Sequence, residues 1–452
     1  MLADGAFDGL HFGHMEHLRV ARALGDRLVV VLPTDERVAQ RKGMARPRFP
    51  LAKREEMLRA LRWVDDVIVS DDPFTVVAMM QPTFYVKGEE YDPSNTEGDV
   101  EAEHQRMIGL VESYGGKVVY TDTMLASSTA LLNRHLPVWP EGAEEFIQKI
   151  RATYSFDEAW GWIDRAVNLQ TVALGERILD EYQYVIPAQK SPKENVVTFV
   201  LDGQVQFDGG SLAVAAHLKE LTDTICLPCT HPTPEHGGFE VTKRRWVTRP
   251  FLQKVFSLEE VHPFFPYKFE GVARSDLWVV ADFGHGAFPH REVCGAVEML
   301  APWLALTVQA NSLNYGLNTL AKWQHADYVV VDELELRLAR QDDRSTLVYL
   351  IEKEAGRLGC SMFAVTLGHR GCLIWDRHGI TMAPALAIRV VDRMGAGDAF
   401  LAWTAPLVKL GMPRDLVALV GNLAGAIQVG VVGNSEPVSK ANIKRWLKGV
   451  LA

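Results

Sequence analysis

The chain has 452 residues, 48% of them hydrophobic and 23% charged, which is enough for two or three globular domains with well-filled cores. Acidic side chains outnumber basic ones by 57 to 47, and the pI is about 5.8. This balance offers no broad basic surface to nucleic acid or to an anionic membrane, so neither is expected as a partner. No apolar run approaches the roughly 18 residues of a membrane-spanning helix, and neither end resembles a signal segment. We therefore expect a cytoplasmic protein.

Five cysteines are present, an odd number that does not suggest a disulfide framework in a chain of this size. Cys226 and Cys229 have the spacing of metal ligands, and His231 and His236 follow closely. A structural zinc needs four converging ligands, and the sequence has no second CxxC pair. We therefore favour a strand end followed by a polar loop over a metal site.

From the start to about residue 136, strand-like apolar runs alternate with amphipathic helical ones. The strand-like runs are RLVVVL, DDVIVS, PTFYVKG and KVVYTD, and AKREEMLRALRWV is helical in pattern. Such alternation predicts a parallel sheet with crossover helices. The segment PVWPEGAEE, with two prolines and a glycine, then predicts a linker over residues 137–152.

The same rhythm restarts in the second half of the chain. Its strand-like runs are TVALGERILDEY, LWVVADF, DYVVVDE, MFAVTLG and AIRVVD, the last of which leads into MGAGDAFLAWTAPLVKLG. No short-period repeat or low-complexity tract interrupts it. We therefore predict an α/β protein with two tandem domains, residues 1–136 and residues 153–452.

The stretch GAFDGLHFGH places two histidines, His11 and His14, three residues apart after a glycine-rich turn. Apolar residues then recur at helical spacing, at Met15, Leu18, Ala21 and Leu24. The two histidines are therefore expected near a helix N-terminus, which suits a phosphate group. Imidazoles at such a place can stabilise the charge that builds on a reacting triphosphate. For a lone pair of histidines, the alternative is a capping or surface role.

This stretch resembles the GxFDxxHxGH signature of the cytidylyltransferase-like nucleotidyltransferase family, at Gly5, Phe7, Asp8, His11, Gly13 and His14. Further matches follow in order at Thr34, Asp35, Lys42, Arg54, Lys87, Ser127, Ser128 and Thr129. The resemblance implies a Rossmann-like fold and the attack of a phosphate monoester on the α-phosphate of CTP or ATP, with release of pyrophosphate. It implies catalytic roles for His11, His14 and Lys42. It implies nucleotide contacts from Gly5, Phe7, Asp8, Gly13, Lys87, Ser127, Ser128 and Thr129.

Three details of this domain stand apart from the signature. His17 has no counterpart in it and is expected to be solvated. Only MLAD precedes the glycine-rich turn, so either the true start lies upstream or this edge of the site is loose. The HxGH pair also occurs in class I aminoacyl-tRNA synthetases, but no KMSKS-like segment is visible, and we set that interpretation aside.

A second constellation, RVVDRMGAGDAF, joins an apolar run to a helical one through two glycines. Gly395, Ala396 and Gly397 leave the backbone free to approach a phosphoryl group, with a helix N-terminus behind it. Asp398 is placed to take the proton of an attacking hydroxyl. A GxGD stretch taken alone is more often a plain turn.

The surroundings resemble the ribokinase-like (PfkB) sugar kinases, whose fold is an α/β/α sandwich. ALGERILDEYQY, FDGGSLAVAAHLKEL and VTLGHRGCLIW each resemble a segment of that family. The resemblance implies that Asp398 is the catalytic base. It implies sugar contacts from Asp180, Gly209 and Gly210, and nucleotide contacts from Gly368, Gly371, Gly395, Ala396 and Gly397.

VTKRRWV, ADFGHGAF and AIQVGVVGNSEPVS are similar to the kinase half of the bifunctional heptose kinase/adenylyltransferases, with the two domains in reversed order. This likeness implies that Lys243, Arg245 and Asp282 surround a sugar phosphate, with plain surface charges as the alternative. In DELELRLA the family's NxxE motif carries Asp332 in place of asparagine and keeps Glu335. Glu335 is the implied Mg²⁺ ligand. The extra carboxylate adds negative charge beside a triphosphate, so the arrangement of the metal ligands is expected to differ from that of the family.

A kinase makes a sugar phosphate, and a nucleotidyltransferase uses one as its nucleophile, so the two predicted activities complete each other. The sequence predicts a homodimer that phosphorylates a sugar with ATP and Mg²⁺. It then uses ATP or CTP to make an ADP- or CDP-linked, heptose-like sugar for surface polysaccharide. The alternative is an active nucleotidyltransferase whose kinase-like domain binds a sugar phosphate or holds a dimer. A regulator with neither activity would leave both signatures unexplained.

Overall fold

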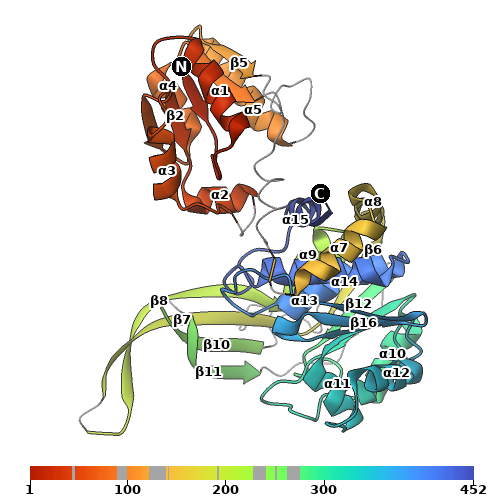
Figure 1. The fold of residues 1–452 in the computed structure, drawn as a ribbon. Helices are drawn as coiled ribbons and strands as arrows, with labels where there is room; N and C mark the ends of the chain where they lie inside the picture. The colour runs from red at the N-terminus through yellow and green to blue at the C-terminus, as the bar shows by residue number, and fades with distance from the viewer. Residues whose placement is uncertain are drawn as a thin grey trace. The chain divides into compact units, whose positions relative to one another are not determined.

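The structure is a computed structural model that describes residues 1–42, 46–88, 99–121, 139–140, 142–190, 193–227, 241–249, 252–261 and 275–451, with the backbone alone at 42 and 99–103. The chain divides into two compact units, Met1–Val138 and Trp139–Ala452 (Figure 1). Each unit has its own sheets and its own buried core.

The first unit is built on a five-stranded sheet in the order β3-β2-β1-β4-β5, and all of its strand pairs are parallel. Its strands are β1 (Leu2–Asp4), β2 (Val29–Leu32), β3 (Asp66–Val69), β4 (Phe84–Gly88) and β5 (Lys117–Thr121). Its helices are α1 (Phe12–Ala23), α2 (Asp35–Lys42), α3 (Leu51–Arg59), α4 (Pro73–Met80) and α5 (Asp99–Ser113). Apolar side chains fill both faces of the sheet, because alternate strand residues enter two separate clusters.

The short strand β1 takes the central place in this sheet, between β2 and β4. Leu2 and Ala3 are fully buried and point into the two different clusters. The strand order reverses direction between β1 and β4, and the carboxyl ends of strands at such a switch point are where ligands usually bind in parallel sheets. The glycine-rich turn and α1 begin directly after β1, which places the predicted histidines at that switch point.

The second unit is centred on an eight-stranded sheet in the order β17-β16-β15-β14-β13-β12-β6-β9. Its strands are β6 (Gln170–Gly175), β9 (Asp223–Cys226), β12 (Leu277–Asp282), β13 (Leu304–Val308), β14 (Tyr328–Asp332), β15 (Met362–Thr366), β16 (Cys372–Asp376) and β17 (Gly379–Ala383). The pairs are parallel from β9 to β15, whereas β15, β16 and β17 run antiparallel to one another.

Helices cover both faces of this sheet (Figure 1). They are α7 (Ala143–Thr153), α8 (Phe156–Ala166), α9 (Ser211–Lys219), α10 (Arg291–Leu300), α11 (Glu333–Arg340), α12 (Leu347–Leu358), α13 (Ala396–Lys409), α14 (Arg414–Gln428) and α15 (Lys440–Leu451). Helix α13 is enclosed along its length, with every residue from Asp398 to Val408 buried. It packs closely on α14, where a Cβ added at Gly421 would lie 2.4 Å from the Phe400 ring.

A second, four-stranded sheet in the order β11-β10-β7-β8 belongs to the same unit. Its strands are β7 (Arg177–Lys190), β8 (Val197–Gly210), β10 (Val241–Thr248) and β11 (Gln253–Val261). One residue, Glu176, separates β7 from β6, so the chain passes directly from one sheet to the other. The long β7–β8 ribbon extends away from the eight-stranded sheet (Figure 1).

The predicted fold class, α/β with two tandem domains, is confirmed. Two local expectations were wrong. Residues 143–152 of the expected linker form α7 together with Thr153, and this helix buries Phe146, Ile147 and Ile150. Its Arg151 donates to the Val450 carbonyl of α15. Residues 387–392 form no strand; instead Val391 and Asp392 donate their backbone N–H groups to the Val429 carbonyl. In the described ranges, no helix combines the length and apolarity that crossing a bilayer requires.

Candidate active sites

In the first unit, the two histidines of the signature lie together at the start of α1. His11 is the N-cap residue, and its Nδ1 accepts a hydrogen bond from the Gly13 backbone N–H at 3.1 Å. This bond leaves the ring proton on Nε2, which is buried and has no hydrogen-bond partner in the described residues. The His11 and His14 rings stack with centroids 3.9 Å apart, and burial lowers the pKa of His11. Two stacked imidazole rings therefore lie at the N-terminus of α1.

Phe7 supports this pair from the core side. Its ring centroid lies 5.3 Å from that of His14, and its side chain is 4% exposed within the apolar cluster. Its backbone has φ 45°, a left-handed conformation that a bulky residue adopts only when its surroundings hold it there. Gly5 donates its N–H to the Val31 carbonyl at 3.3 Å. Phe7 was predicted to contact nucleotide, but its buried ring positions His14 instead.

Lys87, at the carboxyl end of β4, forms an ion pair with Asp4, at the end of β1. The Lys87 Nζ and Asp4 Oδ1 atoms are 2.8 Å apart, and both side chains are nearly buried. Tyr85 donates a hydrogen bond to the same carboxylate. Burial alone would raise the pKa of Asp4, but the charge and hydrogen bond of Lys87 outweigh it and leave the pKa below its usual value. Asp4 therefore stays ionised and holds the predicted nucleotide-binding lysine at the carboxyl ends of β1 and β4.

Asp8 was predicted to contact nucleotide, and the structure gives its carboxylate a different task. Arg46 Nη1 lies 2.6 Å from Asp8 Oδ2, and the two side chains are 3% and 1% exposed. Asp8 Oδ1 accepts the backbone N–H groups of Arg48 at 2.7 Å and Phe49 at 3.0 Å. Both oxygens are thus committed to the 46–49 segment. Asp8 fixes the turn that carries the histidines rather than binding a ligand itself.

Arg54 ties three segments of the site together from a fully buried position. Its guanidinium donates to the carbonyls of Ala6, Pro33 and Phe49, and to Asp35 Oδ1 at 2.7 Å. These contacts link the glycine-rich turn to the residues after β2. Thr34 makes two 2.8 Å bonds to Asp71 on the surface.

His17 was expected to be solvated, and that expectation was wrong. It is 9% exposed, and its Nδ1 lies 2.7 Å from Thr121 Oγ1 at the end of β5. Burial lowers its pKa to about 4, with the Lys87 charge contributing. A neutral His17 is therefore part of the packing beneath the site. The side chain of Lys42 and the triplet Ser127, Ser128 and Thr129 lie outside the described residues.

In the second unit, a cavity of about 370 Å³ lies where the four-stranded sheet meets the carboxyl ends of the eight-stranded sheet. It gathers most of the residues predicted for the kinase: Asp180, Gly210, Lys243, Arg245, Asp332, Glu335, Gly395, Ala396, Gly397 and Asp398. The carboxyl ends of parallel strands are the usual place for ligands in such sheets. The sugar-side and phosphate-side predictions thus meet in one cavity.

The sugar-side wall carries charge from two adjacent strands. Arg245 of β10 forms an ion pair with Asp180 of β7, and Lys243 Nζ lies 3.6 Å from Glu259. Burial lowers the pKa of Lys243, partly offset by the Glu259 charge. Gly209 lies beside Asp180, and a Cβ added there would stand 2.3 Å from Asp180 Oδ2. Glycine at 209 therefore makes room for the carboxylate rather than lining the cavity itself.

The phosphate-side wall is the GAGD turn at the start of α13. Gly395 is the N-cap residue with φ 74°, and a Cβ there would lie 2.3 Å from Asn434 Oδ1. Asp392 fixes the turn from below, accepting N–H bonds from Met394 at 3.2 Å and Gly433 at 3.1 Å. Tyr182 also donates to Asp392. The free N–H groups of the first turn of α13 therefore border the cavity, where an anion is favoured.

Asp398 lies in that first turn and is 8% exposed as a residue. Gln309 Nε2 donates to its Oδ1 at 3.0 Å. Burial, and next the negative charge of Asp180, raise the pKa of Asp398 to about 7. A carboxylate with a pKa near neutrality is suited to accept and release a proton at physiological pH.

Asp332 and Glu335 cap helix α11 reciprocally. The Asp332 carboxylate accepts from Glu335 N at 2.7 Å, and Glu335 Oε2 accepts from Asp332 N at 2.8 Å. Glu335 Oε1 accepts from Ala310 N at 3.2 Å. Burial, and next the Asp332 charge, raise the pKa of Glu335 to about 8. Both carboxyl groups line the cavity beside the phosphate-side wall, and they are oxygen ligands of the kind that Mg²⁺ takes, typically one or two carboxylates plus phosphate oxygens.

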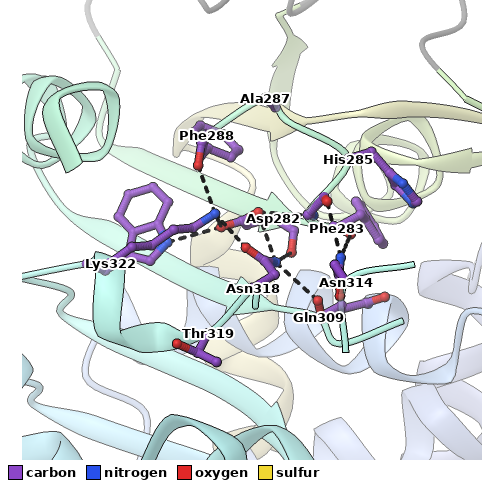
Figure 2. A network of polar contacts seen from close by, with 12 residues as sticks. Asp282, Phe283, His285, Ala287, Phe288, Gln309, Asn314, Asn318, Thr319 and Lys322 are labelled. Carbon is purple, nitrogen blue, oxygen red and sulfur yellow. Dashed lines mark hydrogen bonds and ion pairs between the residues drawn. The ribbon is translucent and has the colours of Figure 1, made fainter. Parts of the chain in front are cut away.

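Asp282 was predicted to lie around a sugar phosphate, and this was wrong. It is fully buried and its carboxylate belongs to an internal network (Figure 2). Lys322 Nζ lies 2.6 Å from Asp282 Oδ2, Trp323 Nε1 donates to the same oxygen, and Gly284 N and Asn318 Nδ2 donate to Oδ1. Every face of the carboxylate is occupied, so none is left for substrate.

Other predicted residues lie away from the cavity lining. Gly368 and Gly371 belong to the turn between β15 and β16, where left-handed backbone is needed, with φ 59° and 95°. Cys226 ends β9 with its Sγ 3.8 Å from the Ser211 carbonyl, and Cys229, His231 and His236 lie outside the described residues. Among the described residues, no cluster of three or more His, Cys, Asp or Glu side chains is arranged for a metal.

Two residues of the second site, Gln309 and Glu176, match no signature in the sequence. Gln309 follows the buried strand β13 and reaches Asp398. Glu176 accepts backbone N–H bonds from Phe283 at 3.0 Å, His285 at 2.9 Å and Ala287 at 3.1 Å. Glu176 thereby shapes the loop whose Phe283 lines the cavity. A polar residue directly after a buried apolar strand was the one available hint in each case.

Comparison with known proteins finds two family matches along the chain. Residues 2–147 match the cytidylyltransferase-like family, and residues 308–441 match the pfkB family of carbohydrate kinases. The chain is 42% identical over 137 residues to the "Bifunctional protein HldE" of Streptomyces coelicolor, covering 29% of this chain and 27% of that protein. It is 35% identical over 145 residues to the protein of the same name from Syntrophotalea carbinolica, covering 31% of this chain and 28% of that protein.

The matched region therefore spans about a quarter of the length of these curated relatives. Among solved structures, a putative ribokinase from Agrobacterium tumefaciens aligns with a TM-score of 0.50 and 14% identity, covering 62% of this chain and 98% of that one. At that identity the likeness concerns the fold alone. The chain therefore joins a region that matches the cytidylyltransferase-like family to a region that matches the pfkB family of carbohydrate kinases, and both are families of transferases.

Proposed function

We propose that the chain is a bifunctional sugar kinase and sugar-phosphate nucleotidyltransferase that makes a nucleoside-diphosphate-activated sugar. The main support is the cavity of the second unit, where Asp180, Lys243 and Arg245 face the GAGD turn and Asp398. One wall carries groups suited to a polyhydroxylated, anionic ligand, and the other carries a helix N-terminus and a base. This arrangement suits the transfer of a phosphoryl group to a sugar hydroxyl.

In the proposed kinase step, Asp398 takes the proton of the sugar hydroxyl as its oxygen attacks the γ-phosphorus of ATP. The new O–P bond forms, the bond from the γ-phosphorus to the bridging oxygen breaks, and ADP leaves with the bond electrons. The N–H groups at the start of α13 stabilise the charge on the transferring group. Asp180 and Arg245 orient the sugar. Asp332 and Glu335 would hold Mg²⁺, which neutralises phosphate charge when bound.

In the proposed transferase step, an oxygen of the sugar phosphate attacks the α-phosphorus of ATP or CTP, and pyrophosphate leaves. The protein positions the reactants and stabilises charge, so no side chain forms a covalent bond. His11 Nε2–H, His14 and the N-terminus of α1 are the donors for the triphosphate. Lys87, held by Asp4, supplies positive charge at the carboxyl ends of β1 and β4.

The finer identity of substrate and product belongs to the same proposal. We propose a heptose-like sugar phosphorylated at its anomeric hydroxyl, and an ADP- or CDP-linked product used for surface polysaccharide. The relatives named bifunctional protein HldE support the pairing of two activities in one chain. A cytoplasmic homodimer, with Mg²⁺ as the cofactor, is part of this proposal.

The test uses two variants of the full chain and two assays on each preparation. Asp398→Asn keeps the size of the side chain but cannot accept the proton, so phosphorylation should fall by about 10²–10⁴-fold. Pyrophosphate release from ATP or CTP with a supplied sugar 1-phosphate should stay near the parent rate. His14→Ala should do the reverse, lowering nucleotidyl transfer by at least about 100-fold and sparing phosphorylation.

Each variant is thus the control for the other. If a folded His14→Ala protein transfers nucleotide as fast as its parent, the assignment of the first unit is wrong. If the parent phosphorylates no sugar from a broad panel yet binds sugar phosphates, the second unit is a binding module. The reciprocal capping of Asp332 and Glu335 is the feature that favours this second candidate, because it commits both carboxylates to the helix end.

A further inference from the structure

Gln309 is a cavity residue to which neither the sequence signatures nor the proposed mechanism assigns a task. It follows β13 directly, at the carboxyl edge of the eight-stranded sheet. Its Nε2 donates to Asp398 Oδ1 at 3.0 Å, across a sequence separation of 89 residues. No hydrogen bond from the described part of the chain engages the second oxygen of Asp398, Oδ2.

The main chain of Gln309 is held by the buried network around Asp282 (Figure 2). Gln309 N donates to the Asp282 carbonyl at 2.8 Å, and its own carbonyl accepts from Asn318 Nδ2 at 3.1 Å. Asn318 is fixed in turn by Lys322, whose Nζ donates to Asn318 Oδ1 at 2.6 Å. A side chain whose backbone is bonded on both sides has a restricted position from which to reach its partner.

Charged groups approach Asp398 from several elements. Burial raises the pKa of Asp398 to about 7 and the charge of Asp180 on β7 adds to the rise, whereas the Gln309 hydrogen bond and the charge of Lys243 on β10 oppose it. Glu335 on α11 faces the same group, since the charge of Asp398 contributes to the raised pKa of Glu335. An amide N–H can only donate, so the bond is stronger when the carboxylate is charged.

We propose that Gln309 is the positioning residue of the Asp398 carboxylate: its amide fixes Oδ1, so that Oδ2 receives the proton of the sugar hydroxyl. The inference rests on the proposed kinase activity of this cavity. Gln309 does not exchange a proton with substrate. It acts through Asp398 by holding its orientation and favouring its ionised state.

The test compares the parent with Gln309→Leu, which keeps a side chain of similar size and removes the donor. The kcat for phosphorylation should fall about 10–100-fold, and the acidic limb of the kcat–pH profile should move up by about one pH unit, because the ionised base loses a hydrogen bond. The KM for the sugar should change less than about threefold. Gln309→Glu should move the acidic limb further, since it places a like charge beside Asp398.

Asn422→Leu is the matched control. Asn422 is a buried amide on α14 that donates to the Ala418 carbonyl at 3.0 Å and lies outside the cavity lining. Its loss should leave the pH profile in place, even if the unit becomes less stable. A Gln309→Leu enzyme with an unshifted acidic limb overturns the inference, whatever its kcat.

A second measurement separates failure of this inference from failure of the proposed function. ¹³C NMR of aspartate-labelled protein, with Asp398→Asn to assign the signal, reports the titration of Asp398 without any turnover. Gln309→Leu should raise that titration midpoint. An unchanged midpoint overturns the positioning role even in an active kinase, whereas a parent that phosphorylates no sugar overturns the kinase proposal and the role with it.

Discussion

The buried pair Asp8–Arg46 allows a direct test of whether Asp8 binds nucleotide or holds the fold. Asp8→Asn preserves the shape of the side chain, and its amide oxygen can still accept from Arg48 N and Phe49 N. Its NH₂ group, however, faces Arg46 Nη1, so a donor meets a donor at a place where solvent has little access. Removing one member of a buried ion pair typically costs about 3–5 kcal/mol.

That loss is a large share of the roughly 5–15 kcal/mol that stabilises an ordinary domain. It corresponds to a fall in Tm on the order of 10 °C for a unit of this size. Hydrogen exchange measured by mass spectrometry at increasing urea follows peptides of Met1–Val138 separately from those of Trp139–Ala452. The first unit should lose protection early in Asp8→Asn, and the second unit should be unchanged.

Asp71→Asn is the control for this experiment. Asp71 also accepts two bonds, from Thr34 N and Thr34 Oγ1 at 2.8 Å each, but at the surface. Its substitution should cost less than about 1 kcal/mol, because water replaces the lost contacts. If Asp8→Asn leaves the stability of the first unit unchanged and raises the KM for the nucleotide at least tenfold, the structural role is refuted and the original expectation stands.

Two further predictions follow from the raised and lowered pKa values. The pKa of Asp398 is about 7 in the folded protein, whereas an ordinary aspartate has a pKa of about 3.9. Between these two pH values the folded state keeps a proton that the unfolded state loses, so the stability of the second unit falls as the pH rises from about 4 to about 7. In urea titrations, Asp398→Asn should therefore be more stable than its parent at pH 8 and equally stable near pH 4. If variant and parent were equally stable at both pH values, the raised pKa of Asp398 would be refuted. The pKa of His17 is about 4, below the ordinary 6.5 or so, so its contribution is present above pH 6.5 and is lost as pH falls towards 4. His17→Leu should destabilise the first unit by about 1–3 kcal/mol at pH 7. It should also remove the fall in the free energy of unfolding between pH 6.5 and pH 4, and a fall of unchanged size in the variant would assign it to other groups.

The features that the sequence predicted correctly are those that depend on neighbours along the chain. Alternating apolar runs gave the parallel strands, and the glycine-rich turns before α1 and α13 placed His11, His14 and Asp398 at helix starts. The strand expected before the GAGD turn failed because AIRVVD is apolar enough for a strand but pairs with a helix end at Val429 instead. Helix α7 was missed because two prolines and a glycine precede an amphipathic run.

The direction of a carboxylate was the feature that the sequence could not provide. Asp8, Asp282 and Asp398 each lie within two residues of a glycine, yet Asp8 and Asp282 are paired with buried basic groups, whereas Asp398 faces the cavity of the second unit. The partner that decides the matter for Asp8 is Arg46, 38 residues away, and for Asp282 it is Lys322, 40 residues away by the numbering. Long-range ion pairs of this kind leave no local pattern. The same holds for Gln309, whose link to Asp398 exists only in three dimensions.

The enclosure of helix α13 bears on how sequence variants of this protein should be interpreted. The helix that begins with the GAGD turn has no exposed residue from Asp398 to Val408, and the contact of Phe400 with Gly421 leaves no space for one more methyl group. A substitution at residues 399–408, beyond the GAGD turn, will therefore deplete folded protein before it reports on chemistry. In a genetic screen, loss of function at positions 399–408 would mark reduced abundance, and a catalytic interpretation would require that the soluble protein level be measured alongside activity.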